Sequence, residues 1–463
     1  MSSAGSPPPF PRTSFAEWRD VVEDGLGPDA VTSRLRATTE DGIPVEALYA
    51  PGGPGDGQAW NLAGRVGGVL PGGEAGFGIR QRFPLNAPPE ELEAAIAGGV
   101  QSLEFRVGDG EREGRALAAS LKRVDTSTVE LSLEGMSAAQ QASDGAAFAG
   151  FRMSWGIDPI SRAWYQAGAA ASLRSELLAL PHAAKSGTAH SLLRASGEPI
   201  FDAGATTGMT LGATLAAAVA YLRALDDAGA DPAWAASVIE ARLPCSPRLF
   251  ETIAMLRAAR LLWARVLEVA GIVPVPLRVV ASSGRRVLTR HDPWNNALRN
   301  TAVGFAAAVG GADLLQLLPH DVRTADPGAA AMRLARTTGL VLREEASLSK
   351  VLDPAAGSWF LESLTASLAQ EAWDELRRLD AAGGIMSAIA SGELSRRVAE
   401  AAAARHARVR ARRHPIIGVT EHPVEGEAVP RSAEDAALAA LDGPFPFRPD
   451  ALPYEVLQAE QPR

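Results

Sequence analysis

The stretch that decides the fold runs from Val287 to Leu364: VLTRHDPWNNALRNTAVGFAAAVGGADLLQLLPHDVRTADPGAAAMRLARTTGLVLREEASLSKVLDPAAGSWFLESL. The steps Asp292-Pro293 and Asp326-Pro327 are typical of helix starts. An aspartate can accept from free backbone amides, and a proline in the first turn has no amide proton to leave unpaired. The third step, Asp353-Pro354, precedes Ala-Ala-Gly-Ser and predicts a turn before a long amphipathic helix.

Upstream of this stretch and into it, strand-like and helix-like segments alternate. Helical patterns cover residues 88–98, 112–121, 210–226 and 249–268. Seven segments have the composition of strands, at 102–107, 128–133, 151–155, 189–196, 236–243, 275–281 and 312–318. The alternation predicts an α/β protein, either a parallel eight-stranded barrel or an open doubly wound sheet, and does not separate the two. In a barrel, the eighth strand is expected near Leu177–Leu180.

Composition excludes several classes of protein. With 463 residues, 46% hydrophobic and 21% charged, the chain can bury a large globular core. The net charge of -9 argues against nucleic acid as the main partner. The single cysteine, Cys245, excludes an internal disulfide and a cysteine-cluster metal site. The start, MSSAGSPPPFPR, lacks the apolar run of a secretory signal, so we expect a cytoplasmic protein.

One uncharged run, Ala203–Leu222, has glycines at 204, 208 and 212, spaced like a membrane dimer motif. The run is too weakly hydrophobic to span a bilayer. We interpret it as a loop followed by a close-packed helix and expect no membrane partner.

The chain divides into four segments. Residues 1–13 are rich in Pro and Ser and are expected to be disordered, and 14–87 form an N-terminal arm and connection. The arm contains a capping box at Ser14–Glu17 and a short strand from Ile43 to Tyr49. Residues 88–345 are predicted as the barrel, and 346–463 as a tail with helices at 358–382 and 391–412. The basic run RHARVRARRH ending the second helix is interpreted as a solvated face.

Several segments resemble the methylmalonyl-CoA mutase family of adenosylcobalamin-dependent acyl-CoA mutases. They are IAMLRAARLLWARV at 253–266, HDPWNNALRNT at 291–301, GGADLLQLLPHD at 310–321 and EEASLSKVLDPAAGSWFLESLT at 344–365. The resemblance favours a TIM-type (β/α)8 barrel with an N-terminal arm and a C-terminal helical extension. It also implies an acyl-CoA threaded along the barrel axis, a cobalamin capping one mouth, and an arm wrapped around a partner subunit.

The family recognises cobalamin through Asp-x-His-x-x-Gly. None of the seven histidines here has an aspartate two residues before it and a glycine three after it. The resemblance therefore implies that adenosylcobalamin is bound by a partner subunit and not by this chain.

Three polar anchors of the family's pocket are replaced. Aligning DAGA at 202–205 with the family's acidic turn puts Glu198 and Pro199 where a Tyr-His pair is expected, and proline has no side-chain donor. The family's His-x-Gln pair falls on Val280 and Ser282. A Thr-Arg-Gly-Pro element, expected before GIRQRF at 78–83, is absent.

We therefore expect no catalytic residue in this chain. Arg257 in LRAAR, Arg278 in LRVVA and Asn295 match polar family positions and are the candidate substrate-binding residues. Alternatively, these residues have only structural roles. The two arginines would then pair with carboxylates, and the asparagine would form hydrogen bonds to the backbone in the first turn of a helix. His291 is expected at the surface beside a helix cap.

The leading hypothesis is a supporting, non-catalytic small subunit of an acyl-CoA mutase, of the methylmalonyl-CoA type, in a heterodimer with a larger catalytic subunit. One alternative is the catalytic, substrate-binding half of a split mutase. Another is an acyl-CoA-binding regulatory barrel. The chain contains no Gly-x-Ser-x-Gly, His-Glu-x-x-His, dinucleotide or Walker motif.

Overall fold

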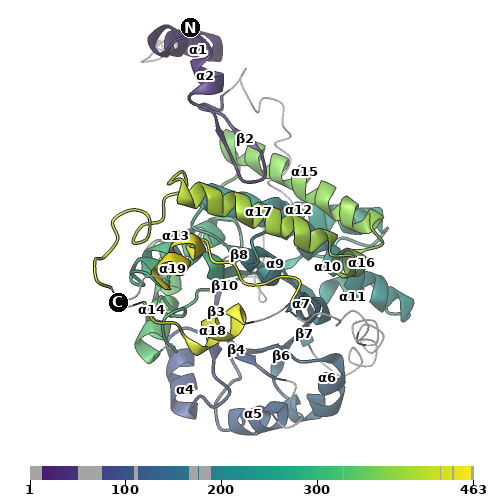
Figure 1. Ribbon diagram of the computed structural model, residues 1–463. Coiled ribbons are helices and arrows are strands. Elements are labelled where there is room, and N and C mark those ends of the chain that lie inside the picture. The colour runs from purple at the N-terminus through teal and green to yellow at the C-terminus, as the bar shows by residue number, and fades with distance from the viewer. Residues whose placement is uncertain are drawn as a thin grey trace, which may run out of the picture.

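A closed barrel of eight parallel strands forms the centre of the protein (Figure 1). The structure is a computed structural model and describes residues 13–50, 76–108, 113–165, 176, 189–326, 328–427, 429–440 and 443–459. The strands are β3 (Gly78–Phe83), β4 (Ser102–Arg106), β5 (Glu130–Glu134), β6 (Arg152–Ile157), β7 (Ala189–Ser196), β8 (Ile239–Cys245), β9 (Arg278–Ser283) and β10 (Leu314–Gln316). The barrel prediction is confirmed, and the seven predicted strands match to within three residues at either end.

The eighth strand of the barrel is β3. The prediction of this strand near Leu177–Leu180 was wrong. β3 pairs with β10 through Gly78 and Leu314, and with β4 through Arg80 and Ser102. The barrel is thus complete without a strand near Leu177–Leu180, a segment outside the described residues, and it begins ten residues before the predicted boundary at 88. The segment GIRQRF falls within the predicted connection at 14–87, but the structure places it in the barrel itself.

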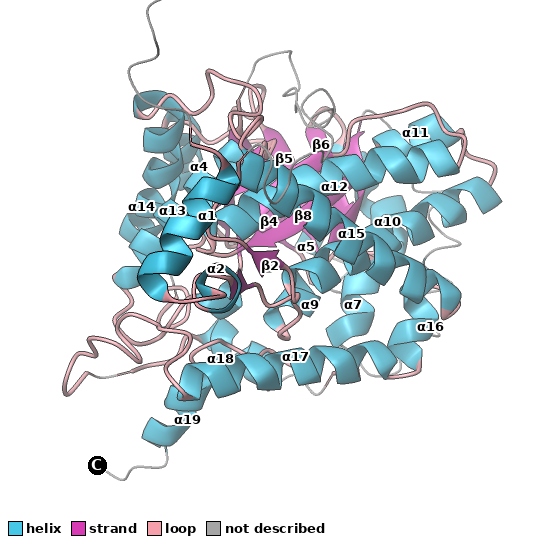
Figure 2. Cartoon of the chain, turned by 90° about the horizontal axis from the view of Figure 1, so that it is seen from above, coloured by secondary structure: helices cyan, strands magenta, loops and turns pink. Residues whose placement is uncertain are grey.

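Helices surround the strands on the outside, as Figure 2 shows from above. Those between strands or directly after the last one are α4 (Pro89–Ala97), α5 (Glu113–Leu121), α6 (Ala138–Asp144), α7 (Pro159–Tyr165), α9 (Glu198–Asp202), α10 (Thr207–Asp227), α11 (Pro232–Ser237), α12 (Leu249–Val269), α13 (Asn295–Val309) and α14 (Ala329–Leu340). This arrangement buries the apolar outer faces of the strands, as in other (β/α)8 barrels.

Helix α10 packs closely against α15 (Trp359–Ala381), the first helix after the barrel. A Cβ added at Gly212 would lie 2.6 Å from Cβ of Glu375 and 2.7 Å from the carbonyl oxygen of Ala372. Among the described residues, α10 is the one helix long and apolar enough to cross a membrane, but 72% of its most apolar window is buried inside the protein. The interpretation as a close-packed helix is confirmed.

A helix follows the first two Asp-Pro steps, but Asp292 does not cap its helix. α13 begins at Asn295, and the Asp292 carboxylate accepts from the Asn295 side chain at 2.7 Å rather than from a backbone amide. α14 begins at Ala329 after Gly328, and Pro327 lies outside the described residues. The turn predicted at Asp353 is confirmed.

The N-terminal arm stands away from the barrel (Figure 1). It consists of α1 (Phe15–Leu26), α2 (Ala30–Ser33) and a two-stranded sheet of β1 (Ala37–Thr38) and β2 (Pro44–Val45). The capping box at Ser14 is confirmed, but the predicted strand at 43–49 is only two residues long. Helix α1 has no buried residue, so its apolar side is uncovered in the isolated chain.

The C-terminal segment continues with α16 (Ile385–Ala390), α17 (Glu393–Arg410), α18 (Ala433–Ala439) and α19 (Leu452–Ala459). The predicted solvated face at the end of α17 is wrong for two residues, since Arg405 is 1% exposed and His406 8%. Arg405 pairs with Glu40 of the arm and donates to the carbonyl oxygen of Gly204 at 3.0 Å. Contacts with the N-terminal arm and with the loop before α10 bury Arg405, whereas His406 lies against Pro449 of the C-terminal segment.

Candidate functional site

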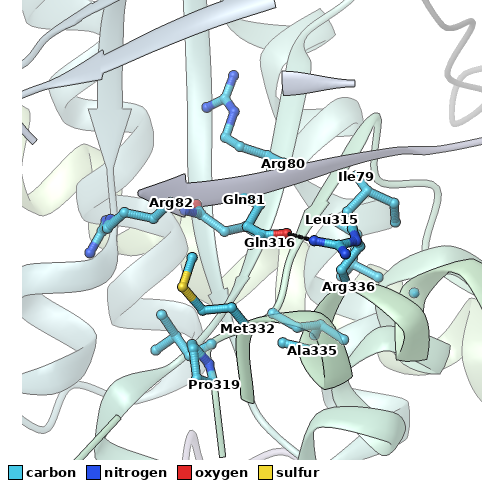
Figure 3. Close-up of a pocket in the computed structure, with 13 residues that line it drawn as sticks. Ile79, Arg80, Gln81, Arg82, Leu315, Gln316, Pro319, Met332, Ala335 and Arg336 are labelled. Carbon is cyan, nitrogen blue, oxygen red and sulfur yellow. Dashed lines mark hydrogen bonds between the residues drawn. The ribbon is translucent and has the colours of Figure 1, made fainter. Parts of the chain in front are cut away.

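The inside of the barrel is lined by charged and small polar side chains. Successive residues of a strand point to opposite faces, so alternate positions of each strand face the axis. Figure 3 shows this on β3, where Gln81 accepts a hydrogen bond of 2.8 Å from Arg336 of α14, while Arg80 and Arg82 extend away from that helix. The inward-facing charged residues are Arg80, Arg82, Glu104, Glu130, Glu134, Arg194, Glu240, Arg242 and Arg278.

Ion pairs cross the barrel axis near its N-terminal end. Arg80 on β3 donates from Nη1 to Glu240 Oε1 at 2.9 Å, although β3 and β8 are not neighbours in the barrel. Its Nη2 donates to Glu130 at 2.9 Å, and Arg278 pairs with the same carboxylate at 2.7 Å. Arg194 adds a second guanidinium to Glu240, also at 2.9 Å. The five strands β3, β5, β7, β8 and β9 are therefore tied together across the interior.

A second set of ion pairs centres on Glu104 and Glu134, nearer the C-terminal mouth. Arg242 donates to both oxygens of Glu104, at 3.0 and 3.1 Å. Arg82 donates to Glu104 at 3.1 Å and also pairs with Glu134, and Arg194 lies 3.4 Å from Glu104. The axis is thus occupied over much of its length by guanidinium and carboxylate groups.

The charged state of this network follows from its composition. Burial by itself raises the pKa of each carboxyl group, but attraction by the surrounding arginines outweighs it. The pKa values of Glu104 and Glu240 therefore lie well below their ordinary value, and that of Glu130 is lowered. All three are ionised at neutral pH, so each guanidinium inside the barrel has a charged partner.

A cavity of about 380 Å³ lies above the network, at the carboxyl ends of the strands. α18 from the C-terminal segment, labelled in Figure 1, contributes Glu434 and Leu438 to the lining of this cavity. Its described lining is Arg82, Arg106, Val107, Gly108, Glu134, Gly135, Met136, Gly156, Asp158, Ser161, Arg162, Arg194, Ser196, Glu198, Pro199, Asp202, Arg242, Ser283, Arg285, Leu318, Glu434 and Leu438. In (β/α)8 enzymes the active site lies at this face.

Two residues that replace the family's pocket anchors lie at this mouth. Glu198 accepts a hydrogen bond of 2.6 Å from Ser282 and lies 3.1 Å from Nε of Arg242. Pro199 lines the cavity without a polar side-chain atom. Asp202, one turn further along α9, accepts from the backbone amide of Arg286 at 3.0 Å, and burial raises its pKa to about 7.

The three candidate substrate-binding residues lie elsewhere and have structural partners. Arg257 is a residue of α12 whose side chain reaches toward α15, and its guanidinium donates to Asp353 from two nitrogens. Arg278 starts β9 at the opposite end of the barrel, and Asn295 donates to Asp292. None of the three is in the described lining of the mouth cavity, and substrate binding by them stays a prediction.

His291 is buried, contrary to the prediction of a surface residue. It is 5% exposed, and its Nδ1 lies 3.6 Å from Glu427. The loop that carries Glu427 packs over this residue, which the local sequence could not show. Among the described residues, no group of three or more His, Cys, Asp or Glu is placed to hold a metal ion.

Sequence reasoning missed the ionic network, although a sign of it was present. The charged residues are two positions apart in the strand sequences SLEFR and IEARL and four positions apart in ELSLE, inside otherwise largely apolar segments. Such alternation in a strand covered by helices on its other face places the charges toward the barrel axis.

Comparison with known proteins identifies the family. The family description "Methylmalonyl-CoA mutase" matches residues 129–439. The methylmalonyl-CoA mutase small subunit of Streptomyces virginiae is 36% identical over 422 residues, which cover 86% of this chain and 68% of that protein. The probable small subunit of Mycobacterium tuberculosis (strain ATCC 25618 / H37Rv) is 35% identical, and 80% of this chain matches 63% of it.

The large subunit of Streptomyces virginiae is 36% identical over 211 residues, which cover 45% of this chain and 29% of that protein. The chain thus spans about two thirds of the length of the small-subunit relatives and matches a large subunit over a shorter region. Together with the eight-stranded barrel and the family match, these similarities show that the chain belongs to the methylmalonyl-CoA mutase family.

Proposed function

We propose that this chain is a cytoplasmic, supporting small subunit of an adenosylcobalamin-dependent acyl-CoA mutase of the methylmalonyl-CoA type, and that it has no activity of its own. The observation that carries the proposal is the ion pair of Arg80 and Glu240 across the barrel axis. An acyl-CoA arm threaded along this axis would have to displace that pair and leave buried charges without partners, which costs several kcal/mol per ion.

The described residues at the mouth of the barrel do not include the Tyr-His pair that the family resemblance leads us to expect there. Pro199 has no donor, and Glu198 is held by Ser282 and Arg242. Val280 is completely buried and apolar. Loss of a positioned acid typically lowers a rate by about 10²–10⁴. These replacements support a catalytic centre on another subunit.

The described residues do not fit a cobalamin. α18 and the residues around it lie over the mouth, where Glu434 is bonded to Arg285 and Arg106 at 2.9 and 2.7 Å. His406 already has a partner, since its Nε2 donates to the carbonyl oxygen of Pro449 at 3.0 Å. We therefore place adenosylcobalamin on the larger subunit.

An uncovered apolar surface is available for that larger subunit. Leu298 is 70% exposed and Phe305 36%, and their spacing of seven residues puts them on one side of α13. Trp294, 65% exposed, precedes Leu298 by one turn, and Leu334 and Val341 are exposed at α14 and just after it. Exposed apolar patches of this kind mark protein interfaces. With the uncovered helix α1, this surface is our candidate contact with the larger subunit.

The test is co-expression with the larger mutase subunit of the same genome, followed by gel filtration and an assay of carbon-skeleton rearrangement. A stable complex is expected, with activity only when the larger subunit is present. Leu298→Asp should weaken the complex, whereas Val273→Asp, at a residue 71% exposed in the loop before β9, is the matched control. Turnover by this chain mixed with a stand-alone cobalamin protein would contradict the proposal.

A further inference from the structure

Two arginines converge on one carboxylate at the floor of the mouth cavity. Arg82 of β3 donates from Nε to Glu104 Oε1 at 3.1 Å, and Arg194 of β7 lies with Nη2 3.4 Å from Glu104 Oε2. Both arginines line the cavity. Because they share the same small carboxylate, their guanidinium groups lie close to each other, although β3 and β7 are on different sides of the barrel.

Each of these arginines has one nitrogen left over. Nη1 of Arg194 is buried and has no hydrogen-bond partner among the described residues, while its other two nitrogens bind Glu240 and Ser132. No hydrogen bond from Nη1 of Arg82 is found among the described residues, and this nitrogen lies 3.9 Å from the carboxylate of Glu434. A buried donor without an acceptor costs about 1–3 kcal/mol, more when it is charged.

The wall beside Arg194 is shaped for the guanidinium group. Gly156 has φ +54°, and a Cβ there would lie 3.0 Å from Cζ of Arg194 and 2.0 Å from the carbonyl oxygen of Leu133. Gly156 lines the same cavity, so its missing side chain leaves room at the point where Arg194 reaches the wall.

The cavity lining itself contains more arginines than carboxyl groups. Six arginines and five carboxyl groups line the cavity within the described residues. Burial raises the pKa of Asp202 to about 7 and also raises that of Asp158, so both carry less negative charge than ordinary aspartates. Arginines thus outnumber ionised carboxylates among the lining residues themselves, while Glu104 and Glu240 below the floor pair with Arg82, Arg194 and Arg242.

A carboxylate already occupies part of this mouth from within the chain. Glu434 of α18 binds Arg285 at 2.9 Å and Arg106 at 2.7 Å, and these guanidinium groups lower its pKa to about 2 despite burial. The neighbouring lining includes the apolar side chains of Val107, Met136 and Leu438. The mouth thus combines oxyanion donors with apolar contacts.

We infer that the mouth cavity is a binding site for a small organic carboxylate without a CoA arm, held by Nη1 of Arg82 and Nη1 of Arg194. A carboxylate accepts charge-assisted hydrogen bonds from both nitrogens, and its short hydrocarbon part contacts the apolar lining. A CoA arm does not fit, because the axis below is filled by the ion pairs of Arg80 and Glu240. This inference does not depend on the proposed supporting role, and failure of either leaves the other standing.

Isothermal titration of the full chain with succinate tests the site, with inorganic phosphate and sodium chloride compared at equal ionic strength. A dissociation constant for succinate below about 1 mM, tighter than that for phosphate by about tenfold or more, is expected. No heat with succinate up to about 20 mM would overturn the inference, at a concentration where a site of about 1 mM would be saturated. Phosphate binding as tight as succinate binding would overturn the organic class of the ligand.

Variants locate the binding. Arg82→Gln should weaken succinate binding by about tenfold, the loss of one charge-assisted hydrogen bond. Leu438→Trp should abolish it by filling the cavity from a half-exposed position on α18, without touching the ionic network. Arg223→Gln, at an arginine 60% exposed on α10, is the matched control and should bind like the parent. Unchanged binding in a folded Leu438→Trp variant would show that the ligand lies elsewhere.

Discussion

The guanidinium of Arg257 binds the carboxylate of Asp353 through two parallel hydrogen bonds, Nε to Oδ1 at 2.9 Å and Nη2 to Oδ2 at 3.1 Å. Arg257 also donates to Glu362 at 2.8 Å and to Thr365 at 3.0 Å. These contacts join α12 of the barrel to the turn before α15 and to the first turns of α15. Two of the segments that resemble the mutase family, 253–266 and 344–365, therefore meet in one buried contact. Their charged residues hold the C-terminal helices on the barrel.

Arg257→Ala should destabilise the protein by about 3–5 kcal/mol, because it leaves the Asp353 and Glu362 carboxylates buried without their partner. Urea unfolding followed by circular dichroism measures the loss. Arg223→Ala is the control, since its pair with Asp380 is exposed and is expected to contribute less than about 1 kcal/mol. Similar losses in both variants would contradict a structural role for Arg257.

Glu240→Gln should destabilise the barrel by about 3–5 kcal/mol, since Arg80 and Arg194 would lose their shared countercharge in the interior. The control is Glu400→Gln, at a glutamate that pairs with Arg396 on the exposed side of α17. Thermal unfolding of the two variants is the measurement. A Glu240→Gln protein as stable as the control would mean that the interior network contributes little.

The same network predicts a loss of stability in acid. The folded-state pKa values of Glu104 and Glu240 lie below their unfolded values, so their stabilisation is present above about pH 4.3 and is lost as the pH falls below it. Unfolding free energies of the parent chain should therefore decrease between pH 6 and pH 3. In Glu240→Gln this decrease should be smaller, because one of the titrating groups is gone.

Asp202→Asn should have the opposite pH dependence. The folded-state pKa of Asp202 is raised to about 7, so its ionisation destabilises the fold increasingly as the pH rises from about 4, and fully above about 7. The variant should be more stable than the parent by about 1–2 kcal/mol at pH 8, the cavity-facing carboxyl being partly exposed, and little changed at pH 4. Equal differences at both pH values would contradict the raised pKa.

Gly212→Leu should destabilise the packing of α10 on α15. Even a Cβ at this position would lie 2.7 Å from the Ala372 carbonyl oxygen, so the two helices must separate. We expect a loss of more than about 3 kcal/mol, in the range of severe overpacking. The control is Ala220→Leu, at a half-buried position on the same helix, which tests whether added side-chain volume alone causes the loss. Gly229→Ala cannot serve as the control because Gly229 has a φ of +76°.

Local patterns in the sequence determined much of the fold. Seven strands and the long helices followed from hydrophobic period, the Ser14 capping box from its spacing, and the turn at Asp353 from its Pro and Gly residues. These features depend on neighbours within a few residues, so they can be read from the chain alone. The family resemblance likewise rested on contiguous motifs.

What only the tertiary structure decided concerns contacts between distant residues. β3 was not among the predicted strands, and the carboxylate partners of its arginines come from strands up to 160 positions away, as in the pair of Arg80 and Glu240. The burial of His291 and Arg405 likewise depends on the C-terminal loop and the N-terminal arm. Whether a charged side chain is solvated, or buried with a partner, depends on what packs against it across the fold, and local sequence does not contain that information.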